Sequence, residues 1–300
     1  QQSCPLTAEF QILLRKRIER QVLSLSGLAL GGIDFEKPSG DPGLFGPESI
    51  TWRIHGDFSS MLCGGVSALL LQMLHPLALA GVWDHSSFRE DMLGRLRRTS
   101  QFISGTTFAP VKDANALIEK VKSIHLRVTG TDAYGTPYAA SDPDLLVWVH
   151  VAEAYSFLQS HLRYRNPSLS LADQNRYYHE FARVAKSLGA VNVPDSVAAV
   201  DEYLQAMRPH LRCDERTLEV VKLLQNAPAP SRLAKPVGSL MIQAGIELLP
   251  EWAATQLGIS LSRAKRRNIR FATRRIAGVL RLAVRNGSWH RAMRRMGCLN

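Results

Sequence analysis

The order of apolar and polar residues along the chain predicts helices rather than a sheet. Between residues 8 and 28, apolar residues recur every three or four positions, which is the period of an amphipathic helix. Thr7 precedes this segment and can cap it, and Gly31 follows it. From Lys37 to Pro47 the chain is rich in Pro, Gly and Asp, which is typical of a loop.

A dense apolar run from Ser59 to Leu74 is too long for one strand and does not alternate. We expect a buried helix here that stops near Pro76. Another helix is expected to open at Asp113 and close at Gly130. Its apolar stripe carries His125, three and four residues from other apolar positions.

The pair Asp142-Pro143 marks a further helix start, because a capping side chain precedes a proline at the first helical position. Leu146, His150, Ala154 and Phe157 share a face of that helix. Later helices are expected at 171–188, 195–210, 214–225 and in pieces from 240 onward. No internal repeat is present, and no strands alternate with the helices. We therefore predict an all-α fold, with one globular domain over 1–255 and a basic helical extension over 256–300.

The net charge of +11 is concentrated in that extension. Twelve Lys and Arg residues and no acidic residue follow Glu251, so the first 251 residues carry a net charge of −1. Apolar residues interleave with these arginines, as in an amphipathic helix. This segment is either a docked helix with a solvated basic face or a surface for anionic membrane or nucleic acid. Of these two partners, we do not expect nucleic acid.

The remaining composition is that of an ordinary globular protein, with 45% apolar residues. The longest apolar stretch, Ala68 to Trp83, is interrupted by polar residues, so no membrane span is expected. The first residues do not have the pattern of a secretory signal. Four cysteines lie far apart, without the spacing of a zinc site. We expect a cytoplasmic protein, with peripheral membrane contact through the basic extension as an option.

Candidate chemistry rests on histidines within apolar helices, because the common nucleotide, zinc-protease and hydrolase motifs are absent. A neutral imidazole on an apolar stripe needs partners for its nitrogens. His125 either bonds a carbonyl or carboxylate, or binds a metal such as haem iron. His150 has the same character, and Glu153 one turn later could orient its ring. His75 is expected to cap the last carbonyls of the helix before Pro76.

A basic cluster at 95–99 lies between apolar segments. Arg95, Arg98 and Thr99 are three and four residues apart and would share one side of a helix. The usual role of such a cluster is a solvated face. Directed into a haem pocket, an arginine can pair with a propionate and a threonine can donate to bound dioxygen.

Several ordered motifs resemble the rubber-oxygenase catalytic domain family, which includes latex clearing protein and a fungal oxygenase of mycophenolic acid biosynthesis. The resemblance covers roughly residues 45–255. It is carried by the sequences Gly46-Pro47-Glu48-Ser49, Trp52-Arg53-Ile54-His55-Gly56-Asp57, Gly64-Gly65, Ala68 to Pro76, Asp84-His85-Ser86-Ser87-Phe88, Arg95-Leu96-Arg97-Arg98-Thr99, Ile124 to Gly130, Tyr138, Asp142-Pro143, Leu145 to His150, Val193-Pro194-Asp195-Ser196 and Tyr203.

The resemblance implies an all-helical fold that holds b-type haem, with His125 as the axial ligand of the iron. Arg95 and Thr99 match a pair in the haem pocket of latex clearing protein. Arg98 stands where that protein has a lysine that can cover the open side of the iron. Because a guanidinium group stays protonated and is a poor metal ligand, we do not expect Arg98 to cover the iron as that lysine does. Rubber itself is not the expected substrate.

The leading hypothesis is a haem b-dependent oxygenase or peroxidase-like enzyme that takes dioxygen or peroxide and a small hydrophobic substrate. His125 would hold the iron, with Arg95, Arg98, Thr99 and His150 around the cofactor. His55 and Asp57, with Arg95 and Thr99, are candidates for proton delivery. One alternative is a binding protein that acts through the basic extension. Another is a non-haem metal enzyme that uses His125, His150 and either Asp142 or Glu153.

Overall fold

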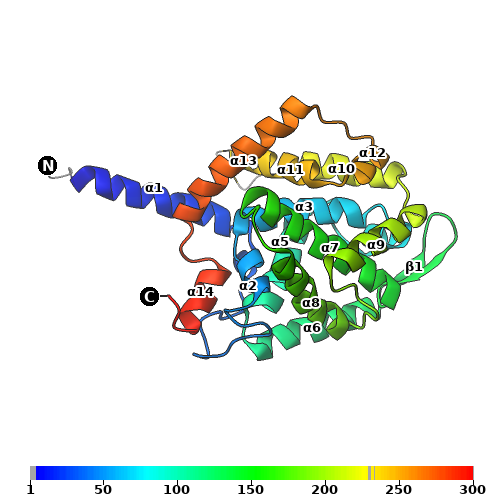
Figure 1. Cartoon of the computed structure of the whole chain (residues 1–300), viewed down its shortest axis with the longest axis horizontal. Coiled ribbons are helices and arrows are strands. Elements are labelled where there is room, and N and C mark those ends of the chain that lie inside the picture. Colours follow the sequence, from blue (N-terminus) through cyan, green and yellow to red (C-terminus); the bar gives the residue numbers. More distant parts are fainter. Residues whose placement is uncertain (1–4, 229–230, 233, 300) are drawn as a thin grey trace.

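The computed structural model describes residues 5–228, 231–232 and 234–299, and it shows helices with one small hairpin (Figure 1). The all-α prediction is confirmed. In chain order, the elements are α1 (Pro5–Leu23), the 3₁₀ helix η1 (Gly27–Leu30), α2 (Ile50–His55), α3 (Phe58–Gln72), α4 (Pro76–His85), α5 (Met92–Phe108), α6 (Val111–His125), β1 (Thr129–Thr131), β2 (Pro137–Ala139), α7 (Pro143–Tyr164), α8 (Leu171–Leu188), α9 (Val197–Met207), the 3₁₀ helix η2 (Arg208–His210), α10 (Glu215–Gln225), α11 (Lys235–Leu248), α12 (Glu251–Gln256), α13 (Arg263–Ala283) and α14 (Ser288–Arg295).

Most of these helices begin at a residue whose side chain accepts a hydrogen bond from the first helical turn. Asp142 accepts from the backbone N–H groups of Asp144 and Leu145, as its position before Pro143 predicts. Ser170 and Ser262 cap α8 and α13 in the same way. Short polar residues therefore fix where the helices start.

Helix α3 lies at the centre of the fold, where α7 and α11 pack against it. Two glycines permit this close approach. A Cβ atom on Gly64 would lie 3.0 Å from both the Phe157 ring and the Ser156 carbonyl oxygen of α7. One on Gly245 of α11 would lie 2.4 Å from the Cβ of Val66. The apolar run predicted as a buried helix is thus buried because helices cover it on several sides.

The basic C-terminal helices pack on the rest of the molecule. Glu247 of α11 is fully buried and pairs with Arg270 of α13 at 2.6 Å and with Arg163 of α7 at 2.8 Å. In α14, Arg295 is buried and donates to the backbone carbonyl oxygens of Phe35 and Asp41. The predicted boundary after residue 255 falls within α12.

Several predicted boundaries are wrong in detail. The first helix begins at Pro5, so Thr7 lies inside it rather than before it. Helix α6 ends at His125 instead of Gly130, because the chain turns there into β1 of the hairpin, which the periodicity did not indicate. His75 caps the following helix, since its Nδ1 accepts from the backbone N–H of Leu77 at 3.3 Å.

In the part of the chain that the structure describes, no single helix is long and apolar enough to cross a bilayer. Helices α3 and α4 reach that length and composition only together, and they bend by 105° at their junction.

Candidate functional site

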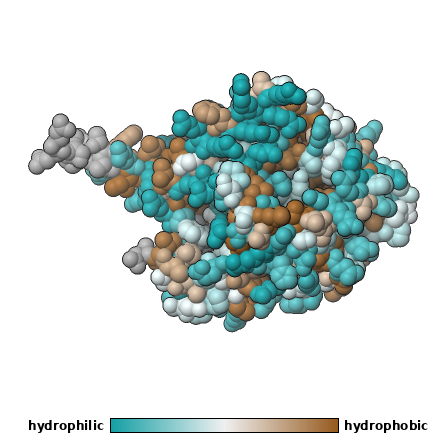
Figure 2. Space-filling view, in the orientation of Figure 1, coloured by the Kyte–Doolittle hydropathy of each residue, from teal (hydrophilic) through white to brown (hydrophobic). Residues whose placement is uncertain are grey.

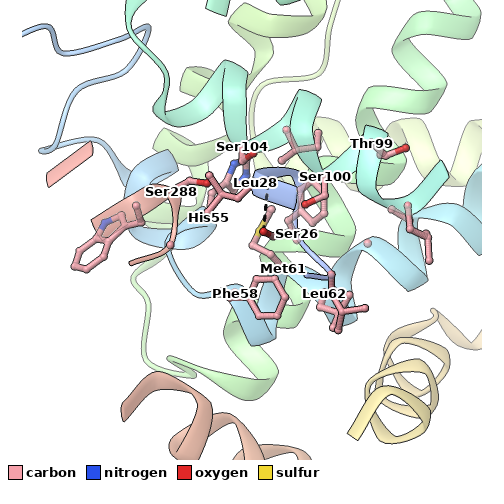
Figure 3. Close-up of a pocket in the computed structure, with 18 of the residues that line it drawn as sticks. Ser26, Leu28, His55, Phe58, Met61, Leu62, Thr99, Ser100, Ser104 and Ser288 are labelled. Carbon is pink, nitrogen blue, oxygen red and sulfur yellow. Dashed lines mark hydrogen bonds between the residues drawn. The ribbon is translucent and has the colours of Figure 1, made fainter. Parts of the chain in front are cut away.

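An apolar cavity of about 300 Å³ lies between α3, α5 and α7 (Figure 3). Residues of the segment around η1 and of the chain entering α14 line it from other sides. Figure 3 shows Thr99 and Ser288 at opposite ends of the cavity. Most of its surface is contributed by Leu23, Leu25, Leu28, Phe58, Met61, Leu62, Val66, Leu69, Leu96, Ile103, Phe108, Val149, Phe157, Val284 and Trp289.

One wall of the cavity is a face of α5, formed by Arg95, Leu96, Thr99, Ser100, Ile103 and Ser104, which we call the α5 wall. The spacing of three and four residues predicted that Arg95 and Thr99 share one side of a helix, and both line the cavity.

Arg95 is the charged group of the α5 wall. Its guanidinium donates to the hydroxyl of Ser86 at 3.0 Å, and no carboxylate among the described residues pairs with it. Burial, together with the nearby charge of Arg98, lowers the pKa of Arg95. Arg95 is half-buried, and a partly desolvated cation without a counter-ion is suited to bind an anionic group in the cavity.

Gln72 of α3 and Glu153 of α7 supply a second polar spot on the cavity surface. The amide of Gln72 donates to Oε1 of Glu153 at 3.4 Å and to the Val149 carbonyl oxygen at 3.3 Å. Burial raises the pKa of Glu153 to about 7. This carboxyl group can therefore hold or release a proton near neutral pH.

His55 lines the cavity, but both of its ring nitrogens are occupied. Nδ1 is hydrogen-bonded to the hydroxyl of Thr107 at 2.8 Å and Nε2 to that of Tyr177 at 2.9 Å. Burial lowers the pKa of His55 to about 3, with smaller effects from His161 and His150. The ring is therefore neutral and fixed, which is the arrangement of a structural histidine.

Asp57 does not line the cavity. Its Oδ1 caps α3 by accepting from the backbone N–H of Ser60 at 2.8 Å, and its carboxylate pairs with Arg281 and with Arg165. These contacts join α3 to α13 and to the end of α7. Asp57 therefore links helices in this fold, and its predicted part in proton delivery stays a prediction.

His125, the predicted metal ligand, lies at the last position of α6 and is half-buried. It does not line the cavity. Its Nδ1 is buried and has no hydrogen-bond partner in the structure, and burial lowers the pKa of the ring. The side chain thus offers a neutral imidazole with a free nitrogen, as metal ligation requires.

The other predicted cofactor residues also lie outside the cavity. Arg98 is exposed and pairs with Asp91 at 3.5 Å. His150 packs against the ring of Phe181. Among the described residues its Nε2 has no hydrogen-bond partner, and Glu153 is not bonded to it. Burial lowers the pKa of His150 to about 4.

The ligand set of the non-haem alternative is not brought together. Among the described residues, no three His, Cys, Asp or Glu side chains gather where they could hold one ion.

The role of Glu153 as a cavity residue escaped the sequence analysis, which considered it only beside His150 or as a metal ligand. The signal was present, because Val149, Glu153 and Phe157 are spaced by four residues and share the cavity face of α7. An acidic residue on an otherwise apolar stripe was the clue.

Residues 52–282 match the family model described as "ER-bound oxygenase mpaB/B'/Rubber oxygenase, catalytic domain". The match includes α3, α5 and α7, which carry the cavity, and α6, which carries His125. No curated protein and no solved structure gives a significant match.

Proposed function

The chain belongs to the ER-bound oxygenase mpaB/B'/rubber oxygenase catalytic-domain family, and from this premise we propose that it is a haem b-dependent oxygenase for a small hydrophobic substrate. The observation that carries the cofactor assignment is Arg95, a cation without a counter-ion on the wall of an apolar cavity. Haem combines a large apolar surface with two carboxylates, which is the chemistry that such a wall fits.

Two groups would hold the cofactor from neighbouring helices. Helices α5 and α6 follow one another in the chain, are joined by two residues and pack against each other. Arg95 would pair with a propionate, and the free Nδ1 of His125 fits the role of axial ligand that the family resemblance assigns to it.

When bound, haem supplies the activation of dioxygen or peroxide. The chain's own residues orient the substrate and control protons. The apolar lining from α3 and α7 holds a hydrophobic molecule and excludes water. The hydroxyl of Thr99 can donate a hydrogen bond within the cavity, and Glu153 can hold a proton at its carboxyl group. His55 keeps its neighbours in place without taking part in proton transfer.

The proposal is tested by titrating the protein with haemin and with haemin dimethyl ester, whose carboxylates are blocked. The wild-type protein should bind haemin with a Soret band and bind the ester about tenfold or more weakly, which is the range for a hydrogen bond to a charged group. Arg95→Gln should bind both compounds equally weakly.

Arg98→Gln serves as the control, because Arg98 lies three residues away but is exposed and paired with Asp91. Because its side chain does not line the cavity, Arg98→Gln should weaken haemin binding far less than Arg95→Gln. Equal binding of haemin and its ester by the wild-type protein would rule out the role of Arg95, and a haemin spectrum that the protein does not change would rule out haem binding.

A further inference from the structure

The positive charge of α13 is divided between two faces. On the inner face, Arg266 and Arg270 pair with the buried Glu247, and Arg281 pairs with Asp57. Arg274 donates to the backbone carbonyl oxygen of Arg163. These contacts neutralise or satisfy the inner arginines, and they attach the helix to the rest of the molecule.

The outer face of α13 has cations without acidic partners next to exposed apolar side chains. Arg267 and Arg275 are exposed and pair with no carboxylate among the described residues. Phe271 and Leu282 are 65% and 70% exposed, and the guanidinium of Arg275 lies 5.4 Å from the centre of the Phe271 ring. Since 271, 275 and 282 are separated by four and seven residues, they form one stripe.

Helix α1 continues this surface. It extends from the body of the molecule beside the end of α13 (Figure 1). Glu19 attaches it there by accepting from the backbone N–H groups of Arg285 at 2.6 Å and Asn286 at 2.7 Å. Figure 2 shows hydrophobic side chains among hydrophilic ones along α1.

The composition of α1 resembles that of the outer face of α13. Phe10 and Leu13 are more than half exposed, and Lys16 and Arg20 are exposed cations without acidic partners in the described part of the chain. Both helices thus present large apolar side chains and unpaired positive charge to the outside.

We propose that α1 and the outer face of α13 bind an anionic lipid surface. Helices with exposed Phe and Leu among Lys and Arg insert their apolar side chains at the headgroup boundary and attract anionic lipids. Nucleic acid would neutralise the cations but leave Phe271 and Leu282 in water. A second copy of the chain would bring two basic faces together, which repel.

A second apolar cavity of about 280 Å³ lies beneath α1. It lies between α1, α3, α11 and α13, and it shares Leu25, Phe58 and Leu62 with the cavity of the candidate site. If the proposed function holds, a lipid-soluble substrate could pass from the bilayer under α1 to the α5 wall. The docking itself does not depend on that function.

The test is co-sedimentation of the full chain with vesicles of phosphatidylcholine alone or with 30% phosphatidylserine. Wild-type protein should bind the anionic vesicles, bind neutral ones far less, and lose binding as salt rises. Arg267→Gln/Arg275→Gln should weaken binding by roughly thirtyfold, from about fivefold for each charge. Phe271→Ser/Leu282→Ser should weaken it by at least about tenfold.

Matched controls change the same chemistry elsewhere. Lys112→Gln/Lys120→Gln removes two exposed charges from α6, and Leu171→Ser/Val191→Ser removes side chains that are 61% and 53% exposed at the two ends of α8. Both controls should bind like wild type, and circular dichroism should show that all variants are folded.

Three results would each overturn the proposal: no binding to anionic vesicles, equal loss in the controls, or binding to duplex DNA in place of vesicles. Because the vesicle assay needs neither haem nor catalytic turnover, its result does not depend on whether the proposed function is correct.

Discussion

Two parts of the molecule treat buried polar groups in opposite ways. Where α3, α7 and α11 meet α13, Asp57 pairs with two arginines and Glu247 with three. Nearby, each ring nitrogen of His55 has a hydrogen-bond partner. On α5 and α6, among the described residues, Arg95 is bonded only to a hydroxyl and the buried Nδ1 of His125 has no partner. We call the first region the complete region because its two buried acids have their counter-charges, whereas Arg95 and His125 have binding capacity left for a ligand.

The largest effect should come from removing an acid of the complete region. Glu247→Gln leaves Arg163, Arg266 and Arg270 without their counter-charge, and loss of one partner from a buried pair costs about 3–5 kcal/mol of unfolding free energy. Urea denaturation measures this loss. Glu119→Gln, which removes an exposed pair with Lys122, should cost less than about 1 kcal/mol. Equal losses would mean that the buried cluster adds nothing.

Acid should also destabilise the fold through its buried histidines. Burial lowers the pKa of His55 to about 3 and that of His150 to about 4, from 6.5 in the unfolded chain. Because the folded state keeps these rings neutral, their contribution is intact above pH 6.5 and falls as the pH drops toward these values. Each histidine should then cost about 1.4 kcal/mol per pH unit. Urea midpoints between pH 7 and pH 5 measure this slope, and a flat profile would contradict the assignment.

Replacing Arg281 or Arg95 should change the stability of the protein by smaller amounts, and these amounts should differ because the two arginines have different partners. Arg281→Met leaves Asp57 buried beside only Arg165, and we expect a loss of about 2 kcal/mol. In the haem-free protein, Arg95→Met removes a cation that lacks a counter-ion, so stability should stay within about 1 kcal/mol of wild type or rise. Thermal denaturation of the two variants in parallel makes the measurement. A larger loss for Arg95→Met would place Arg95 among the structural arginines.

The sequence predicted the helices well where local signals were strong. The start at Asp142-Pro143 and the 171–188 helix are found as predicted, since caps and periodicity act within a few residues. Helix α2 was not predicted because it is short and packs mainly on α8, which is distant in sequence. The hairpin at 129–139 was missed because its two strands have only three residues each, too few to show an alternating pattern.

The candidate site was predicted only in part, for the same physical reason. The spacing of Arg95 and Thr99 placed both on one helical face, which is local information. Whether a buried polar group has a partner depends on the tertiary fold. Thr107 and Tyr177, which occupy His55, are 52 and 122 residues away from it, and Arg281 is 224 residues from Asp57. The sequence could therefore nominate His55 and Asp57 but could not show that they were already satisfied.

The central claim is that His125 is the axial ligand of haem iron. The absorption spectrum of the haemin-loaded protein tests this claim most directly. Wild-type protein and His179→Ala, which removes an exposed histidine, should show the same Soret band. In His125→Ala the Soret band should return to the position and width of free haemin, and added imidazole should restore the wild-type band. A His125→Ala variant that keeps full haem content and an unchanged Soret band would contradict the account.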